Sequence, residues 1–287
     1  MTESTQVTFP AYTTIRLEQK GALTWLILNR PEKANALSNE LLDEFSDALR
    51  FLETAGGPVI AIRGEGRGFS AGFDLDQVGK LTSAKDAVSD RERLQRNLNR
   101  FLAIWDHPKP IIAAVHGYCA AGATQMCVYA DITIVADNVR ISEPTVPIGG
   151  GYIAPLWVPL VGPKRAKEFA FVPGNSINGP TAVEWGWANH CVAADELIAV
   201  VEDLAERIAM IAPEVLRIKK LSINKAADAM GFRAASASVA EMDTLLHFST
   251  PVLELKQWIQ EVGLKTAMQH YRVESTNPLT TTRKPDQ

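Results

Sequence analysis

A glycine-rich stretch, GEGRGFSAGFDL at residues 64–75, is the first segment whose composition could support chemistry. Its four glycines within nine residues predict tight turns, or a close approach of the main chain to another group. The stretch contains a GxSxG pattern centred on Ser70, which in serine hydrolases marks the nucleophile. That motif needs a strand directly before the serine and a helix directly after it, whereas Ser70 follows loop residues. A serine hydrolase using Ser70 therefore remains an alternative hypothesis.

A second segment, AAVHGYCAAGATQM at residues 113–126, runs from an apolar strand through small residues into a helix. Small side chains allow a ligand to approach the main chain, and a helix N-terminus offers amide groups without internal partners. Such a place can stabilise a negatively charged oxygen. Tight packing of the helix on the sheet explains the small residues equally well, so both interpretations stay open.

A third segment, LNRPEKANALS at residues 28–38, combines a strand end, a proline turn and a helix cap. Arg30 and Lys33 could contact a phosphate group, although a solvated surface is the commoner reason for such side chains. This segment alone does not identify a function.

The overall composition limits the class of protein. The chain has 287 residues, a formal net charge of -4 and a pI near 5.8, which argues against broad nucleic-acid binding. The first residues show no signal-peptide pattern, and no apolar run approaches the ~20 residues that span a membrane, so we expect a cytoplasmic protein. The spacing of the three cysteines fits neither a disulfide framework nor a zinc site, so we expect reduced thiols and no metal.

Hydrophobic periodicity predicts a strand, strand, helix order that repeats along the first two thirds of the chain, which indicates an α/β fold. The predicted strands are Tyr12–Glu18, Leu23–Leu28, Pro58–Ile62, Ile111–Val115, Ile132–Ala136 and Arg140–Ser142, and the predicted helices are Ser38–Glu53 and Asp86–Trp105.

The pattern changes near residue 192, after which nearly all of the chain is predicted to be helical. The predicted helices are Asp195–Ile211, Pro213–Met230, Phe232–Phe248 and Pro251–Gln260. We therefore expect an α/β core at residues 1–192 and a helical region at residues 193–273. Residues 274–287 are polar and contain two prolines, so we expect a disordered tail.

The three segments together, in this order, resemble the enoyl-CoA hydratase/isomerase (crotonase) superfamily. The family's LNRP, AGxDL and HGYxxxG motifs are all present, and the resemblance extends over about residues 12–250. It implies a crotonase-like spiral of ββα turns with an all-helical C-terminal region that associates into trimers or dimers of trimers. It also implies an acyl-CoA thioester as substrate, with no cofactor beyond its coenzyme A moiety.

The resemblance also implies roles for particular residues. The backbone amides of Phe73 and Gly122 would hold the thioester oxygen in an oxyanion hole. Removing a proton next to the thioester places negative charge on that oxygen, and one preorganised donor is worth roughly 3 kcal/mol there. The family's coenzyme-binding positions correspond here to Lys33, Ala34, Ala36, Ala71, Asp74 and Leu75.

The sequence departs from the family at the two catalytic glutamates of the hydratases. Gln125 and Thr145 occupy the positions that we match to them. A glutamine amide accepts no proton at useful pH, and threonine is a poor base, so we expect poor hydratase activity. Glu143 lies two residues before Thr145 and shares its face in an extended segment, which makes it the candidate replacement. A glutamate that lies on the surface or forms a salt bridge is the alternative.

Three hypotheses follow for the function. The first is an acyl-CoA enzyme that stabilises a thioester enolate and then isomerises, hydrolyses, cleaves or slowly hydrates its substrate. The second is a catalytically weak or silent acyl-CoA-binding protein. The third is the serine hydrolase that uses Ser70.

Overall fold

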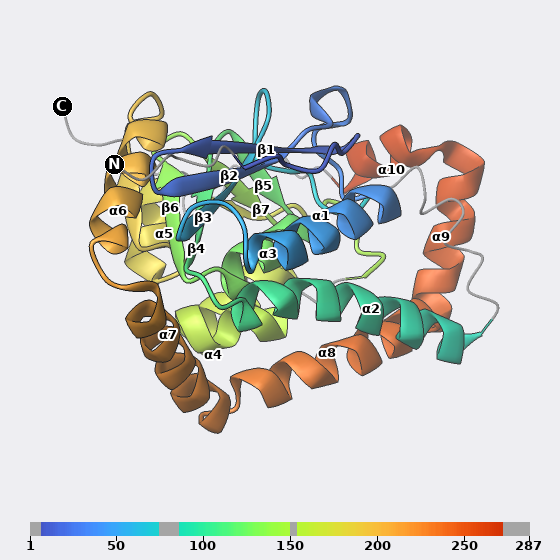
Figure 1. Ribbon diagram of the computed structural model, residues 1–287. Helices are drawn as coiled ribbons and strands as arrows, with labels where there is room; N and C mark the ends of the chain where they lie inside the picture. Colours follow the sequence, from blue (N-terminus) through green and yellow to red (C-terminus); the bar gives the residue numbers. More distant parts are fainter. Residues whose placement is uncertain (1–6, 75–85, 150–153, 272–287) are drawn as a thin grey trace.

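The computed structural model describes residues 7–74, 86–149 and 154–271 (Figure 1). Leu75 and the expected tail from residue 274 lie outside these ranges.

Six strands form the main sheet, in the order β1-β2-β3-β4-β6-β9. The strands are β1 (Ile15–Lys20), β2 (Leu23–Leu28), β3 (Val59–Gly64), β4 (Ile111–Val115), β6 (Ile132–Ala136) and β9 (His190–Val192). The β1–β2 pair is antiparallel, and every other pair in this sheet is parallel. All residues of β2 are buried, in agreement with the continuous apolar runs that parallel sheets require.

A second, smaller sheet joins β5 (Tyr118–Ala120), β7 (Arg140–Ser142) and β8 (Ser176–Ile177). β5 follows β4 after a short turn, and β7 follows β6 in the same way. Helix α3 (Ala123–Tyr129) follows β5, and helix α4 (Ala154–Phe171) follows β7. Two of the predicted ββα units, β4-β5-α3 and β6-β7-α4, are thus observed, and each has its second strand in the second sheet.

The helices of the core begin at recognisable caps. Ser38 accepts a hydrogen bond from an amide in the first turn of α1 (Asn39–Leu52), and Asp86 forms a capping box at α2 (Ala87–Asp106). Both helices were predicted to within about one residue. Helix α4 was not predicted, because Pro159, Pro163 and the kink at Gly162 interrupt its pattern. The short helix α5 (Gly179–Trp185) was missed as well.

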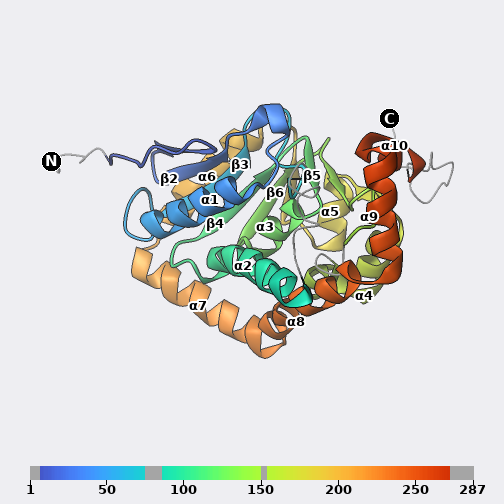
Figure 2. The same cartoon turned by 90° about the vertical axis from the view of Figure 1, so that its right-hand side faces the viewer.

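The C-terminal region is helical, as predicted. It contains α6 (Leu197–Ala209), α7 (Pro213–Ala229), α8 (Phe232–His247), α9 (Thr250–Val262) and α10 (Leu264–His270). Helix α6 packs on the main sheet, and its inner face belongs to the same hydrophobic core. Helix α8 runs beside α2 and α4, and α9 and α10 continue along the flank of the molecule (Figure 2). None of the helices in the described ranges is long and apolar enough to cross a membrane.

The three cysteines form no disulfide, in line with the sequence prediction. Cys119 and Cys127 are buried, with 3.9 Å between their sulfur atoms, and Cys191 is half-buried. Burial raises the pKa of the Cys119 thiol, which keeps it protonated and unreactive.

One buried ion pair ties the helical region to the sheet. The Lys220 ammonium on α7 donates to Asp131 Oδ2 at 2.8 Å and to the main-chain oxygens of Ile104 and Lys109. Asp131 also accepts the amide of Ile111 at the start of β4. Burial lowers the pKa of Lys220 and raises that of Asp131, so each group depends on the other to stay charged.

Replacing Lys220 with methionine should leave the Asp131 carboxylate without its cation. We expect a loss of about 3–5 kcal/mol in the free energy of unfolding, measured by urea denaturation. The control is Lys219→Met, at the exposed neighbouring position, which should change stability by less than about 0.5 kcal/mol. Equal stabilities of the two variants would contradict this account of Lys220.

Candidate active site

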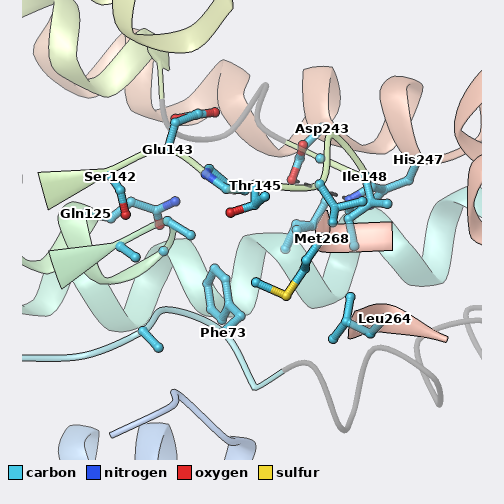
Figure 3. A pocket seen from close by; sticks show the side chains of 18 of the residues that line it. Phe73, Gln125, Ser142, Glu143, Thr145, Ile148, Asp243, His247, Leu264 and Met268 are labelled. Carbon is cyan, nitrogen blue, oxygen red and sulfur yellow. Dashed lines mark ion pairs between the residues drawn. The ribbon is translucent and has the colours of Figure 1, made fainter. Parts of the chain in front are cut away.

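A cavity of about 500 Å³ lies where the three predicted segments approach the C-terminal helices. Its wall combines the turn after β2, the loop after β3, the β5–α3 connection and the segment after β7. The opposite wall comes from α2, α8, α9 and α10 (Figure 3). Its lining is largely apolar, with a few charged and polar groups, as is typical of small-molecule sites.

Main-chain hydrogen bonds join the three predicted segments. Ser70 pairs with the strand at Cys119: its amide donates to Tyr118, and its oxygen accepts from Ala120 at 3.0 Å. On the other side of the loop, the Ala71 amide donates to the Ala34 oxygen at 3.0 Å. The loop at residues 70–74 is therefore held between the other two segments, and the predicted meeting of the three segments is observed.

Gly72 allows this close approach. Its φ of 89° lies in the region that favours glycine, and a Cβ added there would lie 2.7 Å from the Ala120 oxygen and 3.1 Å from the Gly122 nitrogen. A Cβ on Gly122 would in turn meet the Phe73 ring at 2.5 Å. The structure thus brings Phe73 and Gly122, the two predicted oxyanion residues, into direct contact.

The local pairing also orients the Phe73 amide. The Gly72 oxygen and the Asp74 amide both bond to Leu37, so the amide of Phe73 between them points to the other side, toward the β5–α3 connection. In the described part of the chain, the Gly122 amide has no acceptor. Ala121 just before it has a φ of 50°, a strained value for a residue with a side chain.

Asn35 holds the turn after β2 in place, and the sequence analysis missed it. Its side chain is fully buried, accepts the Arg30 amide at 2.9 Å and donates to the main-chain oxygens of Glu65 and Gly68. It also has a left-handed φ of 51°, which asparagine tolerates better than most residues. The signal in the sequence that could have indicated this role is an asparagine within a proline turn.

Some of the predicted coenzyme-binding residues line the cavity, and others do not. Ala34 and Ala71 line the cavity, Lys33 is exposed, and Ala36 is half-buried. Asp74 is buried and forms an ion pair with Arg30 at 2.9 Å, so it joins two segments of the protein rather than facing the cavity.

Ser70 does not line the cavity. Its side chain is fully buried, and its hydroxyl donates to the Asn35 main-chain oxygen at 2.7 Å and accepts the Gly72 amide. The imidazole of His116, in the segment at residues 113–126, bonds to the Gly66 main-chain oxygen at 3.0 Å. This geometry gives Ser70 a structural role, because its hydroxyl bonds only to main-chain groups within the part of the chain that the structure describes.

Gln125 and Thr145, at the two positions that we matched to the hydratase glutamates, both line the cavity. Gln125 lies on α3 and is completely buried, yet its amide oxygen and nitrogen have no hydrogen-bond partner within the described residues. A buried amide without partners is costly, so a ligand group that pairs with it would gain binding energy.

Glu143, labelled in Figure 3, is one of three acidic residues in the described ranges that line the cavity, together with Asp90 and Asp243. It is 7% exposed, and one carboxyl oxygen is buried without a partner in the described ranges. Desolvation, and then the charge of Asp243, raise the pKa of Glu143 to about 8. The alternative of a surface salt bridge is therefore wrong.

A group of charged side chains from α2 and α8 also borders the cavity, and the sequence analysis did not identify it. His247 Nδ1 lies 2.8 Å from Asp90 Oδ2, and His247 Nε2 lies 3.7 Å from Asp243 Oδ2. Arg93 bonds to the other Asp90 oxygen at 2.6 Å. Asp90 and His247 are 157 residues apart, so no local pattern could reveal their contact.

The raised pKa of Glu143 should make stability depend on pH. Between about pH 4.5 and pH 8 the folded carboxyl keeps its proton while the unfolded one releases it, so the free energy of unfolding falls as pH rises. Glu143→Gln removes this dependence. In this window the free energy of unfolding of the variant, relative to that of the wild type, should rise by up to about 1.4 kcal/mol per pH unit, measured by urea denaturation.

The matched control for this comparison is Glu254→Gln, at an exposed position on α9. Its stability difference from the wild type should stay constant across the same pH range. A Glu143→Gln difference that is also constant would show that Glu143 titrates normally.

Comparison with known proteins identifies the family and the fold. The sequence model of the enoyl-CoA hydratase/isomerase family matches residues 18–252. A hydroxycinnamoyl-CoA hydratase-lyase from Pseudomonas fluorescens is 27% identical over 273 residues, which cover 90% of this chain and 96% of that protein. A crotonyl-CoA hydratase from Syntrophomonas wolfei is 31% identical over 75% of this chain and 83% of that protein.

A solved structure from Novosphingobium aromaticivorans, described as of the enoyl-CoA hydratase/isomerase type, superposes with a TM-score of 0.88. It is 46% identical and covers 92% of this chain and 96% of its own. The fold, the three motifs and the family match agree, and the chain belongs to the enoyl-CoA hydratase/isomerase family.

Proposed function

We propose that this family member stabilises the enolate of an acyl-CoA thioester with the amides of Phe73 and Gly122, and that Glu143 transfers the proton. The observation that carries the proposal is a protonatable carboxyl, Glu143, in the same cavity as the Gly122 amide, which has no acceptor in the described part of the chain. The geometry of Ser70 gives the hydrolase hypothesis no support.

The two amides act on the thioester oxygen. Loss of the proton next to the thioester shifts negative charge onto that oxygen, and fixed amides in a cavity shielded from water stabilise this charge more strongly than water would. The contact at Gly72 fixes both amides before the substrate arrives, so no reorganisation is needed during the reaction. This proton chemistry requires no cofactor beyond the coenzyme A of the substrate.

Glu143 supplies the group that gains and loses the proton. A pKa of about 8 leaves it mostly protonated at neutral pH, ready to donate, and lets it act as a base when ionised. A carboxyl with an ordinary pKa would be ionised at neutral pH and could not donate a proton. The Glu143 segment after β7 runs beside the β5–α3 connection, since the Ala121 amide donates to the Ser142 oxygen at 2.9 Å, and Glu143 lines the same cavity as Gly122.

Coenzyme A would enter past the turn after β2, where Ala34 and Ala71 line the cavity and exposed Lys33 can meet a phosphate. The amides of Ala34, Ala36 and Ala71 already donate within the protein. The turn can therefore offer a ligand its carbonyl oxygens rather than these amides. Asp74 would support this turn through Arg30 instead of touching the ligand.

We also propose self-association as a trimer or a dimer of trimers. Large apolar side chains on α7 are solvent-exposed in the single chain, at Val215, Ile218, Leu221 and Ile223. Exposed apolar surface of this kind is typical of a face that packs against another subunit.

Deuterium exchange at the α-carbon of butanoyl-CoA in D₂O, followed by mass spectrometry, tests enolate formation whatever the final product is. We expect exchange by the wild type to accelerate as pH rises through about 8, where Glu143 ionises. Glu143→Gln should slow exchange by about 100- to 10,000-fold while butanoyl-CoA still binds in calorimetry. Binding without exchange in the wild type would instead indicate a silent acyl-CoA-binding protein.

Hydration of crotonyl-CoA should be slow, because Gln125 cannot exchange a proton with water. We expect Gln125→Glu to raise the hydration rate by at least about 100-fold, followed by loss of the conjugated enoyl absorbance. Gln125→Met, which keeps the size but removes the polar group, should not raise it. Fast hydration by the wild type would show that Glu143 alone suffices for hydration.

A further inference from the structure

The Gln125 side chain has no role in the proton transfer proposed above, yet it lines the same cavity. Among the residues that the structure describes, it is the one side chain that leaves two buried polar atoms, its amide oxygen and its amide nitrogen, without a hydrogen-bond partner. Such atoms are costly to bury unpaired, so a ligand group that pairs with both of them would gain binding energy.

Gln125 lies within one helical turn of the amide that we propose holds the thioester oxygen. Its main-chain amide donates to the Gly122 oxygen at 3.2 Å, in the first turn of α3. Ser142 flanks the same connection, because its main-chain oxygen accepts the Ala121 amide at 2.9 Å. Figure 3 shows the Gln125 and Ser142 side chains next to one another at one end of the view. A ligand group that meets Gln125 would therefore lie only a few bonds from the thioester.

The hydrogen-bonding capacity of Gln125 does not depend on a protonation state. A side-chain amide is uncharged, and it presents one acceptor and one donor group in either orientation of its two atoms. Turning this amide from its buried position toward the cavity breaks no hydrogen bond, because it makes none within the described ranges. The ligand group that completes it must accept from the nitrogen and donate to the oxygen.

A planar carboxamide meets both requirements, whereas simpler polar groups meet only one. A ketone or a carboxylate only accepts and would leave the Gln125 oxygen unpaired, while an ammonium group only donates and would leave the nitrogen unpaired. A hydroxyl has a single oxygen, which cannot form straight hydrogen bonds to two amide atoms that lie about 2.2 Å apart. A carboxamide carries its own oxygen and nitrogen at the same spacing, so two parallel hydrogen bonds can form.

Ser142 offers a partner for the remaining hydrogen of a primary carboxamide. Its side chain is half-buried, lines the cavity and makes no hydrogen bond to another residue in the part of the chain that the structure describes. A carboxylic acid lacks this second hydrogen, and at neutral pH an ordinary acid has lost its only one. Gln125 and Ser142 together therefore favour an uncharged primary carboxamide over an acid.

We propose that the acyl group of the substrate carries a primary carboxamide a few carbons from the thioester, and that this group pairs with both amide atoms of Gln125 and with the Ser142 hydroxyl. This inference rests on the proposed function and adds the chemical class of the acyl group. It also gives Gln125 a role that an ionised glutamate at this position could not fill, because a carboxylate does not donate a hydrogen bond.

Calorimetric titration with matched pairs of acyl-CoAs tests the proposal. Each pair compares a carboxamide with the methyl ketone of the same shape: 4-carbamoylbutanoyl-CoA with 5-oxohexanoyl-CoA, and the shorter 3-carbamoylpropanoyl-CoA with 4-oxopentanoyl-CoA. We expect the carboxamide of at least one pair to bind about tenfold or more tightly, which corresponds to about 1.4 kcal/mol. Equal affinities within both pairs would overturn the inference and leave the proposed function intact. If no acyl-CoA binds, the proposed function fails and the inference fails with it.

The ratio of affinities within a pair separates contact from structural damage. Gln125→Met keeps the size of the side chain and should bring the ratio close to one, while a general loss of structure would weaken both members alike. Ser142→Ala should reduce the ratio, because one hydrogen of the carboxamide loses its partner. The control Gln260→Met, at an exposed position on α9, should keep the wild-type ratio. A ratio that survives in Gln125→Met would rule out Gln125 as the partner.

A carboxylate arm tests the choice of an uncharged group. The acid 4-carboxybutanoyl-CoA should bind more weakly than 4-carbamoylbutanoyl-CoA, because its ionised end cannot donate to the Gln125 oxygen. Tighter binding of the acid would contradict the choice of a carboxamide.

Discussion

The close main-chain contact between residues 70–73 and residues 118–122 is the constraint on which the site depends. It requires glycine at position 72, since a Cβ there would lie 2.7 Å from the Ala120 oxygen. The sheet supplies the two segments, because the loop follows β3 and the β5–α3 connection follows β4, its parallel neighbour. Asn35 then holds the turn after β2 against the same loop. This arrangement brings Phe73 and Gly122 into contact.

Desolvation is the physical effect on which the chemistry proposed for the Phe73 and Gly122 amides and for Glu143 depends. In a cavity of low polarity, a hydrogen bond to a developing negative charge is stronger than in water. The same desolvation disfavours the ionised form of Glu143, and the nearby charge of Asp243 adds to that effect. In the proposed mechanism, one physical cause would thus strengthen the hydrogen bonds of both amides and adjust the pKa of Glu143. The C-terminal helices take part, because α8 contributes Asp243 and closes one wall.

Local signals in the sequence predicted much of the fold. Ser38 and Asp86 marked the starts of α1 and α2, and the apolar runs marked β2, β4 and β6. Helix α4 gave no such signal, because two prolines and Gly162 interrupt the helical spacing of its apolar residues. In the site, the meeting of the three segments followed from their motifs. The burial of Glu143 and the Asp90–His247 contact depend on helices distant in the sequence, so no local pattern could predict them.

The measurement that tests the central claim most directly is the infrared carbonyl stretch of a bound acyl-CoA labelled with ¹³C at the thioester carbonyl. Two amides that donate to this oxygen polarise the bond, so the account predicts a shift to lower wavenumber on binding, reduced in Gly72→Ala because the Phe73 and Gly122 amides are displaced. A labelled band at the same wavenumber for free and bound ligand would contradict the oxyanion hole and the mechanism built on it.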